Sequence, residues 1–217
     1  ILSGSIESLA ELVNNGTINV TGNSKVNIWK MSGNAVNLKD ATLTDSKLGN
    51  VKVYGTNSVT DTELGNVNIG FGMDDSTENA KLSVIGNSKL GYTYVGQDDV
   101  SDRVYSLDFT TAEGQQVTVD QMYIRQNGEV TVSKDSNVKT NYIDLGGTLT
   151  LNEGAVLENT HVNMFIRGRA EKNANGKAQL LIKDGARFNH SETGPNSLLV
   201  VGGVNGDGPA TGSGFIH

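Results

Sequence analysis

Cysteine is absent from this sequence. A small secreted fold stapled by disulfides is therefore excluded, and so are thiolate metal sites and a cysteine nucleophile. Proline (2) and aromatic residues (6%) are also scarce, and only 36% of the 217 residues are hydrophobic. A compact domain of this length would carry more large apolar side chains. The 27 glycines, with so little proline, instead favour repeated strands joined by tight bends.

Positive charge is in deficit, with 17 Lys and Arg against 24 Asp and Glu and a formal net charge of −7. This balance argues against nucleic-acid binding through a basic face and against docking on anionic lipid. No apolar run approaches the roughly 20 residues that span a bilayer, so we expect no membrane insertion by this segment. Residues 1–4 do not form a signal peptide, and we expect the chain to be part of a longer one.

One pattern recurs five times along the chain. Two apolar residues stand two positions apart, a bend of Gly, Asn, Asp or Ser follows, and another apolar residue comes after the bend. The copies span residues 16–26, 80–90, 128–138, 147–157 and 178–188. Because side chains alternate along a strand, each apolar pair faces one side, and such narrow faces are buried when successive coils stack. We therefore predict an all-β fold, a right-handed parallel β-helix (a solenoid).

Between residues 35 and 70 the apolar period shortens to five. The apolar positions, with a one-residue slip before Val59, are Leu38, Leu43, Leu48, Val53, Val59, Leu64 and Ile69. This section resembles the pentapeptide-repeat family, in which each five residues make one side of a four-sided coil. The resemblance leaves open an acidic pentapeptide effector that imitates DNA, although the mixed charges of this section argue against it.

Residues 5–15 carry a different pattern. It predicts a short helix, because Ser5 is in the N-cap position, apolar residues lie on one side and Gly16 ends the pattern. Such a helix would shield the open sheet edge at the end of a β-helix. We therefore divide the chain into an N-terminal cap over 1–15 and a β-helix segment over 16–217, truncated from a longer chain. The irregular stretches, which we interpret as insertions, are residues 72–79, 97–103, 167–177 and 189–196.

The copies GEVTVSKDSNV (128–138) and GTLTLNEGAVL (147–157) are similar to repeats in autotransporter passengers of the AIDA and antigen 43 type. The similarity extends over most of residues 16–200, with a degenerate motif. It implies secretion to the bacterial cell surface in a parent protein anchored in the outer membrane. It also implies an adhesin that mediates self-association (cell aggregation and biofilm) or host attachment. The partner would be another copy of the chain or a host surface glycan or protein.

The motifs of common active sites are missing from the sequence. No H-E-x-x-H helix, G-x-S-x-G elbow or P-loop occurs, and the histidines His161, His190 and His217 are scattered. We therefore predict a binding and structural protein rather than an enzyme, with no cofactor and no metal. The alternative is a carbohydrate-active β-helix enzyme, a polysaccharide lyase or glycosidase, which needs carboxylates that converge near a basic residue.

Acidic residues in the predicted insertions are candidates for binding. They are Asp74, Asp75, Asp98, Asp99 and Asp102, with Arg103 or Arg125 as the basic partner of a lyase-type site. Several carboxylate oxygens in one loop also suit Ca²⁺. The competing interpretation, which we favour, is a solvated loop of an acidic protein.

Aromatic residues supply the remaining candidates. Trp29 follows inward positions in alternation and is predicted to face outward, where an indole stacks on a sugar or packs in an interface. The alternative, which we favour, is that a neighbouring loop covers it. Tyr92, Tyr94 and Tyr105 flank residues 97–103 and are expected to form an aromatic patch with the acidic residues there. Asparagines also recur near the bends, at Asn19, Asn23, Asn50, Asn66 and Asn87. We interpret them as ladders between coils or, alternatively, as a strip for self-association.

Overall fold

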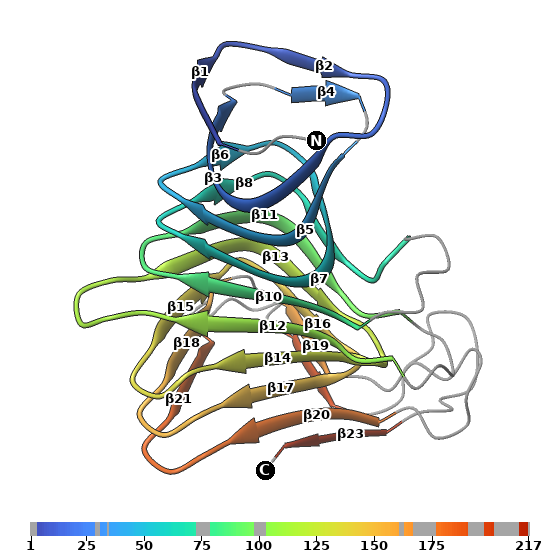
Figure 1. Ribbon diagram of the computed structural model, residues 1–217. Coiled ribbons are helices and arrows are strands. Elements are labelled where there is room, and N and C mark those ends of the chain that lie inside the picture. The colour runs from blue at the N-terminus through green and yellow to red at the C-terminus, as the bar shows by residue number, and fades with distance from the viewer. Residues whose placement is uncertain are drawn as a thin grey trace.

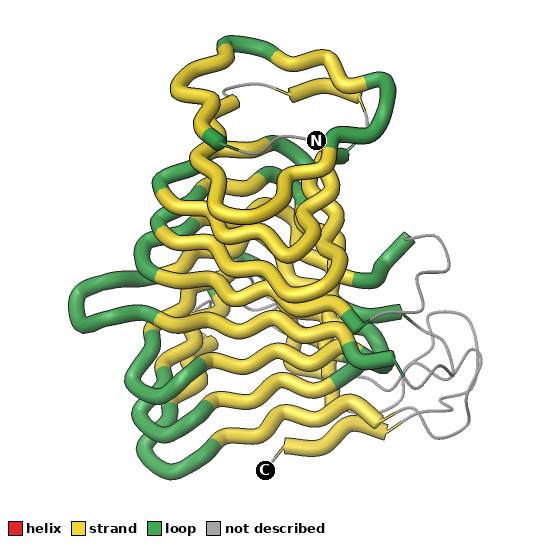
Figure 2. Tube along the Cα trace, in the orientation of Figure 1, coloured by secondary structure: helices red, strands yellow, loops and turns green. Residues whose placement is uncertain are grey.

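A computed structural model describes residues 4–28, 31–33, 35–72, 79–97, 103–160, 163–166, 177–190, 198–201 and 213–216. Within these ranges the regular structure consists of β-strands, and the strands pair in parallel (Figure 2). The part of the chain that the structure describes contains no helix long and apolar enough to cross a membrane. The prediction of an all-β chain of parallel strands is confirmed.

The strands line three faces of a stack in which each turn of the chain lies on the one before (Figure 1). Face A contains β16 (Ile143–Leu145), β19 (Asn163–Ile166), β22 (Leu198–Val201), β9 (Val67–Ile69) and parts of β3 (Asn19–Ile28), β5 (Val36–Thr44), β7 (Val51–Thr60), β11 (Lys89–Val95) and β13 (Val117–Ile124). Face B contains the following parts of β3, β5 and β7, then β10 (Ala80–Ile85), β12 (Tyr105–Thr110), β14 (Gly128–Val132), β17 (Thr148–Leu151), β20 (Lys177–Ile182) and β23 (Ser213–Ile216). Face C contains β1 (Ser5–Leu9), β6 (Lys47–Leu48), β8 (Glu63–Leu64), β15 (Asn137–Thr140), β18 (Val156–Asn159), β21 (Arg187–His190) and parts of β3, β11 and β13.

An apolar core runs through the stack because alternate residues on every face point inward. On face B, Val130 pairs in register with Leu149, and Leu149 pairs with Leu180. On face C, Val138 pairs with Leu157. All five side chains are buried. The inward positions predicted for these repeat copies are confirmed, and each copy is covered by the next one along the stack.

The section with a five-residue apolar period forms three sides per turn. Its apolar positions, all buried, are Leu38, Leu43, Leu48, Val53, Val59, Leu64 and Ile69. Leu38 pairs with Val53, and Val53 pairs with Ile69, so that every third of these apolar positions returns to face A. The four-sided coil that the pentapeptide resemblance implied is wrong for these residues, because three segments of about five residues complete each turn.

Turn length varies along the stack. Hydrogen-bonded partners on adjacent turns lie 16, 19, 26 or 31 residues apart in different places. Most strand pairs keep a single register, but the β3–β5 and β5–β7 pairs shift register where these strands pass from face A to face B. The longer turns have longer connections between their strands.

The helix predicted over residues 5–15 is wrong. The segment forms β1 and β2 (Leu12–Asn14), and β2 pairs with β4 (Met31–Gly33) in a separate two-stranded sheet. β1 continues face C, since Ile6 lies beside Val26 in the register of β3. The open edge of β3 satisfies the backbone groups of β1, whereas an isolated helix of this length is marginal in water. Whether the segment functions as a cap stays a prediction.

The corner between faces B and C combines a left-handed backbone with buried hydroxyl groups. Asp61 has a φ of 47°, and Gly86 occupies the next turn with a φ of 73°. The Asp61 carboxylate accepts a hydrogen bond from the backbone N–H of Asn87 at 2.8 Å. Inside the corner, the backbone N–H of Thr62 donates to the Ser88 hydroxyl at 3.0 Å. The bend therefore satisfies its polar groups through contacts with the neighbouring turn.

A Gly86→Ala substitution tests this corner. A Cβ at Gly86 would collide with the Asp61 carboxylate, while a Cβ at Gly114, which has a similar φ of 77°, would meet nothing within 4 Å. Both variants suffer backbone strain of about 1 kcal/mol. We expect Gly86→Ala to lose about 1–2 kcal/mol more in urea unfolding, because it also displaces a hydrogen-bonded carboxylate. Equal losses for the two variants would contradict the proposed role of the aspartate.

Candidate functional site

Most of the predicted site residues lie outside the described residues. These are Trp29, Asp74, Asp75, Asp98, Asp99 and Asp102. Five of the predicted residues are described: Tyr92, Tyr94, Arg103, Tyr105 and Arg125. Arg103 lies just before β12, and the backbone N–H of Val104 beside it donates to the Asn79 side chain at 2.9 Å. The binding and calcium hypotheses for the acidic residues stay predictions.

The described strands that flank three of the predicted insertions belong to the same two faces. Residues 72–79 follow β9 of face A and precede β10 of face B. Residues 97–103 connect β11 to β12, and residues 167–177 lead from β19 to β20. Each segment therefore leaves face A and enters face B. Residues 189–196 differ, because they begin in β21 of face C and lead to β22 of face A.

Aromatic rings form a row on the outside of face A. The rings of Phe71 and Tyr94 are stacked with centroids 4.8 Å apart, and those of Tyr94 and Tyr123 are stacked at 4.7 Å. Tyr142 continues the row 5.5 Å from Tyr123, and Phe165 lies 6.2 Å beyond it, both with tilted ring planes. These separations are those preferred by aromatic pairs. We call these five residues the ring row.

The strand pattern explains why the rings point outward. Tyr94 lies between the buried residues Thr93 and Val95, and Tyr123 lies between Met122 and Ile124. Tyr94 pairs with Tyr123 in the parallel register. Because side chains alternate across a strand and register partners lie side by side, an outward ring on one turn meets the outward ring on the next.

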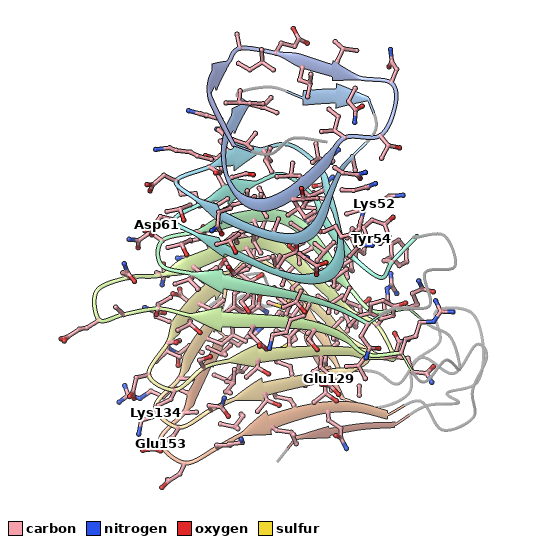
Figure 3. The ribbon with its side chains drawn as sticks, viewed as in Figure 1. Lys52, Tyr54, Asp61, Glu129, Lys134 and Glu153 are labelled. Atoms are coloured by element: carbon pink, nitrogen blue, oxygen red, sulfur yellow. The ribbon has the colours of Figure 1, made fainter. Side chains whose placement is uncertain are left out.

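Face A holds most of the tyrosines of the chain. Five of the six, Tyr54, Tyr92, Tyr94, Tyr123 and Tyr142, occupy outward positions on it or at its edge. Figure 3 shows Tyr54 beside Lys52, on the side of the stack away from Asp61 in this view. An aromatic patch that includes Tyr92 and Tyr94 is therefore present, but it extends along the stack rather than around residues 97–103.

Tyr105 does not belong to this patch, and the prediction that it joins Tyr92 and Tyr94 there is wrong. Its side chain is only 1% exposed and lies in the core of face B. Tyr105 pairs with Ala80 on one side and with Gly128 on the other, so that two small residues leave room for its ring. The core takes this ring because its neighbours are too small to fill the interior alone.

Polar and charged groups surround the ring row. The Arg125 guanidinium lies 5.3 Å from the centroid of the Phe71 ring and 6.0 Å from that of Tyr123, within the range of cation–π attraction. The Tyr123 hydroxyl donates to the Gln121 side chain at 2.6 Å. Asp144, the register partner of Tyr123, is only 3% exposed.

The environment of Tyr123 raises the pKa of its phenol above the ordinary value of 10.0, chiefly through desolvation by burial. The nearby side chains of Tyr94, Tyr92 and Asp144 act in the same direction. Arg125 opposes the shift in the pKa. The phenol is therefore held in its neutral form at physiological pH, as a hydrogen-bonding group rather than as a base.

Asparagine side chains connect the turns at the corners, as one of the two interpretations predicted. Asn50 accepts a hydrogen bond from the backbone N–H of Asn66 at 3.1 Å, and Asn66 accepts one from the backbone N–H of Tyr92 at 3.2 Å. Asn87 accepts one from Gln116 in the same way. These side-chain oxygens are occupied within the stack, which leaves the alternative of an asparagine strip for self-association without support from these groups.

Faces B and C carry opposite charges in pairs across adjacent turns. On face C, Lys47 lies 2.7 Å from Glu63, and Lys139 lies 3.5 Å from Glu158. A hollow of about 420 Å³ near the N-terminal end is lined by Asn23, Ser24, Lys25, Thr42, Thr44 and Asp45. Its side chains are polar or charged and include no ring. Face A therefore contains the candidate binding surface.

Sequence reasoning found Tyr92 and Tyr94 but did not find the row as a whole. The rings of Phe71, Tyr123, Tyr142 and Phe165 were missed. The sequence did contain a signal, namely an aromatic residue between two apolar residues. Met122 and Ile124 flank Tyr123 in this way, and Phe165 is flanked likewise. The unequal turn lengths concealed it, since no single period aligns these triplets.

Comparison with protein-family models, with curated proteins and with solved structures finds no match for this chain.

The stacked rings should contribute to stability. A Tyr94→Leu substitution removes ring contacts with both Phe71 and Tyr123, and we expect it to cost about 1–3 kcal/mol from two aromatic pairs. Tyr92→Leu is the matched control, because Tyr92 is 39% exposed and lies beside the row. We expect the control to change the free energy of unfolding by less than about 0.5 kcal/mol. Urea unfolding of the three proteins measures both, and losses of equal size would contradict a stabilising row.

Tyr123 should make the folded state sensitive to high pH. Its raised pKa means that the unfolded phenol ionises at a lower pH than the folded one. The stabilisation from this group is complete below about pH 10 and is lost as the pH rises through the folded pKa. Thermal unfolding between pH 8 and pH 11 should therefore show a smaller alkaline loss for Tyr123→Phe than for the unsubstituted protein. Tyr54→Phe is the control on the same face, and an equally small loss in that variant would refute the assignment to Tyr123.

Proposed function

We propose that the chain is a segment of a right-handed parallel β-helix that serves as a non-enzymatic adhesin on a bacterial cell surface. The three-faced stack of parallel strands supports the solenoid. Connections between parallel strands are right-handed in nearly all proteins, which supports the handedness. The repeats around residues 128–138 and 147–157, which resemble those of autotransporter passengers, support secretion and an outer-membrane-anchored parent protein.

The observation that carries the adhesin proposal is the ring row on face A. Exposed aromatic side chains with a polar surround are typical of recognition surfaces. Here outward-facing rings repeat on successive turns of one scaffold, with Phe71 38% exposed and the other four rings of the row half-buried. A partner that meets several turns at once gains avidity from contacts that are individually weak. The partner would be another copy of the chain or a host surface glycan or protein.

A second candidate is a carbohydrate-active β-helix enzyme. It is favoured by the grouping of the Tyr123 phenol, the Arg125 guanidinium and the Asp144 carboxylate on face A. The raised pKa of Tyr123 works against a role as general base, because a base near neutral pH needs a lowered phenol pKa. A lyase would produce an unsaturated product that absorbs ultraviolet light. A flat absorbance trace across a panel of acidic polysaccharides would remove this candidate.

An acidic effector that imitates DNA has less support. Such a protein needs a continuous acidic face. Face C alternates lysine and glutamate, as in the pair Lys47 and Glu63, and face B pairs Lys81 with Asp108 at 2.5 Å. Face A carries Lys52 and Arg125. The charge pattern of these faces therefore favours the adhesin proposal over this one.

Beads coated with the purified chain test the adhesin proposal. We expect coated beads to cluster with one another or to attach to host epithelial cells, while beads coated with albumin do neither. Sedimentation velocity over a wide concentration range, at two salt concentrations, separates the two routes, because a shift towards dimer indicates self-association. Beads that neither cluster nor attach would refute an adhesive role for this segment.

A further inference from the structure

The outward positions of face A have an unusual chemistry. Among the described residues between 50 and 146 they carry phenylalanine, tyrosine, asparagine, glutamine, lysine, arginine, aspartate and glycine, with no aliphatic side chain. Register partners on successive turns form three rows, of which Tyr92 and Gln121 belong to one and Tyr94 and Tyr123 to the next. The surface therefore offers rings and hydrogen-bonding groups together, over several turns.

This composition fits a carbohydrate better than a second copy of the chain. The buried centres of homodimer interfaces are about 65% apolar and draw on aliphatic as well as aromatic side chains. A sugar presents an apolar C–H face, which packs on an aromatic ring, and hydroxyl groups around its edge, which need amide or charged partners. Face A supplies both kinds of group at neighbouring positions.

The ring geometry indicates which side chains are available to a sugar. Within the ring row, the face of Tyr94 is covered by Phe71 on one side and by Tyr123 on the other. Tyr92 lies beside the row and is 39% exposed, and Phe71, at the end of the row, is 38% exposed. Tyr92 stands at the same position of the turn as Asn66 before it and Gln121 after it. An exposed ring is thus flanked by amide side chains on both adjacent turns.

Charge indicates a neutral ligand. The chain has a formal net charge of −7, which opposes the approach of an anionic polymer. The Arg125 guanidinium lies against the rings of Phe71 and Tyr123, and Asp144 on the same face is buried. Hydrogen bonding and ring contacts, rather than ion pairing, dominate the exposed part of this surface.

We propose that face A binds a neutral, linear glycan that runs along the stack over the turns of β11, β13 and β16, with a sugar ring packed on Tyr92. The inference names the ligand class of the proposed adhesin and rests on that function. On these turns the amide N–H₂ group of Gln121 and the hydroxyl group of Tyr94 are the candidate partners of the sugar hydroxyls, since the Gln121 amide oxygen already accepts from Tyr123. Each turn contributes one contact, so that affinity rises with the length of the glycan.

Isothermal titration calorimetry of the whole 217-residue chain with soluble oligosaccharides tests the proposal. The probes are neutral series of increasing length, namely gluco-, xylo-, manno- and galacto-oligosaccharides, and one anionic series, oligogalacturonates. We expect binding to at least one neutral series, with affinity that rises with chain length and does not change between low and high salt. Tyr92→Ala should weaken it by about tenfold, the effect of one aromatic contact of about 1.4 kcal/mol.

Two matched variants make the result specific. Tyr92→Phe keeps the ring and should retain affinity within about threefold, which separates ring packing from loss of the hydroxyl. Glu129→Ala alters an exposed residue of face B, marked in Figure 3, and should leave binding unchanged. Urea unfolding of each variant shows that a loss of binding is not a loss of folding.

Several outcomes would overturn the proposal. Binding to none of the neutral series, binding to oligogalacturonates alone with steep salt dependence, or full affinity in Tyr92→Ala would each refute it. Loss of dimerisation in Tyr92→Ala without any glycan binding would assign the face to a second copy instead. Coated beads that adhere while no glycan binds would leave the adhesin proposal standing and remove only the ligand class. Glycan binding without bead adhesion would support the ligand class and remove the adhesin proposal.

Discussion

Parallel pairing of each turn with the next, in register, is the constraint on which the rest of the structure depends. One turn encloses too narrow an apolar strip to form a core alone. Its backbone groups and its inward side chains both find their partners about 4.8 Å away on the neighbouring turns. On face B the sequence Leu82, Leu107, Val130, Leu149 illustrates this, since each is the register partner of the next and all are buried. The stacking constrains residues outside this core less strongly.

The corners show how this freedom is limited. A corner must turn the chain without leaving buried polar groups unpaired, and the neighbouring turn supplies the partners. At the corner between faces B and C, a hydroxyl such as Ser88 accepts from the backbone of Thr62 on the preceding turn. Where Asp61 adopts a left-handed backbone, Gly86 follows on the next turn, since a second side chain would meet the carboxylate. The choice of residue at a corner therefore depends on the turn beside it, not only on local turn preferences.

The repeat analysis predicted what depends on local alternation and failed where partners lie far away in sequence. Period-two apolar pairs such as Leu149 and Leu151 identified inward positions, because alternation is a property of a single strand. The helix predicted from Ser5 was wrong although the apolar spacing there is helical, because the chain pairs with the open edge of β3 and leaves Val13 61% exposed. The ring row escaped prediction because Tyr94 and Tyr123 meet only once the lengths of the intervening turn and corners are known.

The same register that builds the core also arranges the outer surface. Inward residues repeat because a buried side chain must match its neighbours, whereas nothing in the stacking requires outward residues to match. Faces B and C use this freedom for hydroxyl groups and for pairs of lysine with glutamate or aspartate, which are solvated and add little stability. Face A instead lines up rings from Phe71 to Phe165 across successive turns. Stacking accounts for part of their presence, but it does not require that Tyr92 stay exposed beside the row. That exposed ring, set between amide groups, is the feature of face A that stability alone leaves without a reason.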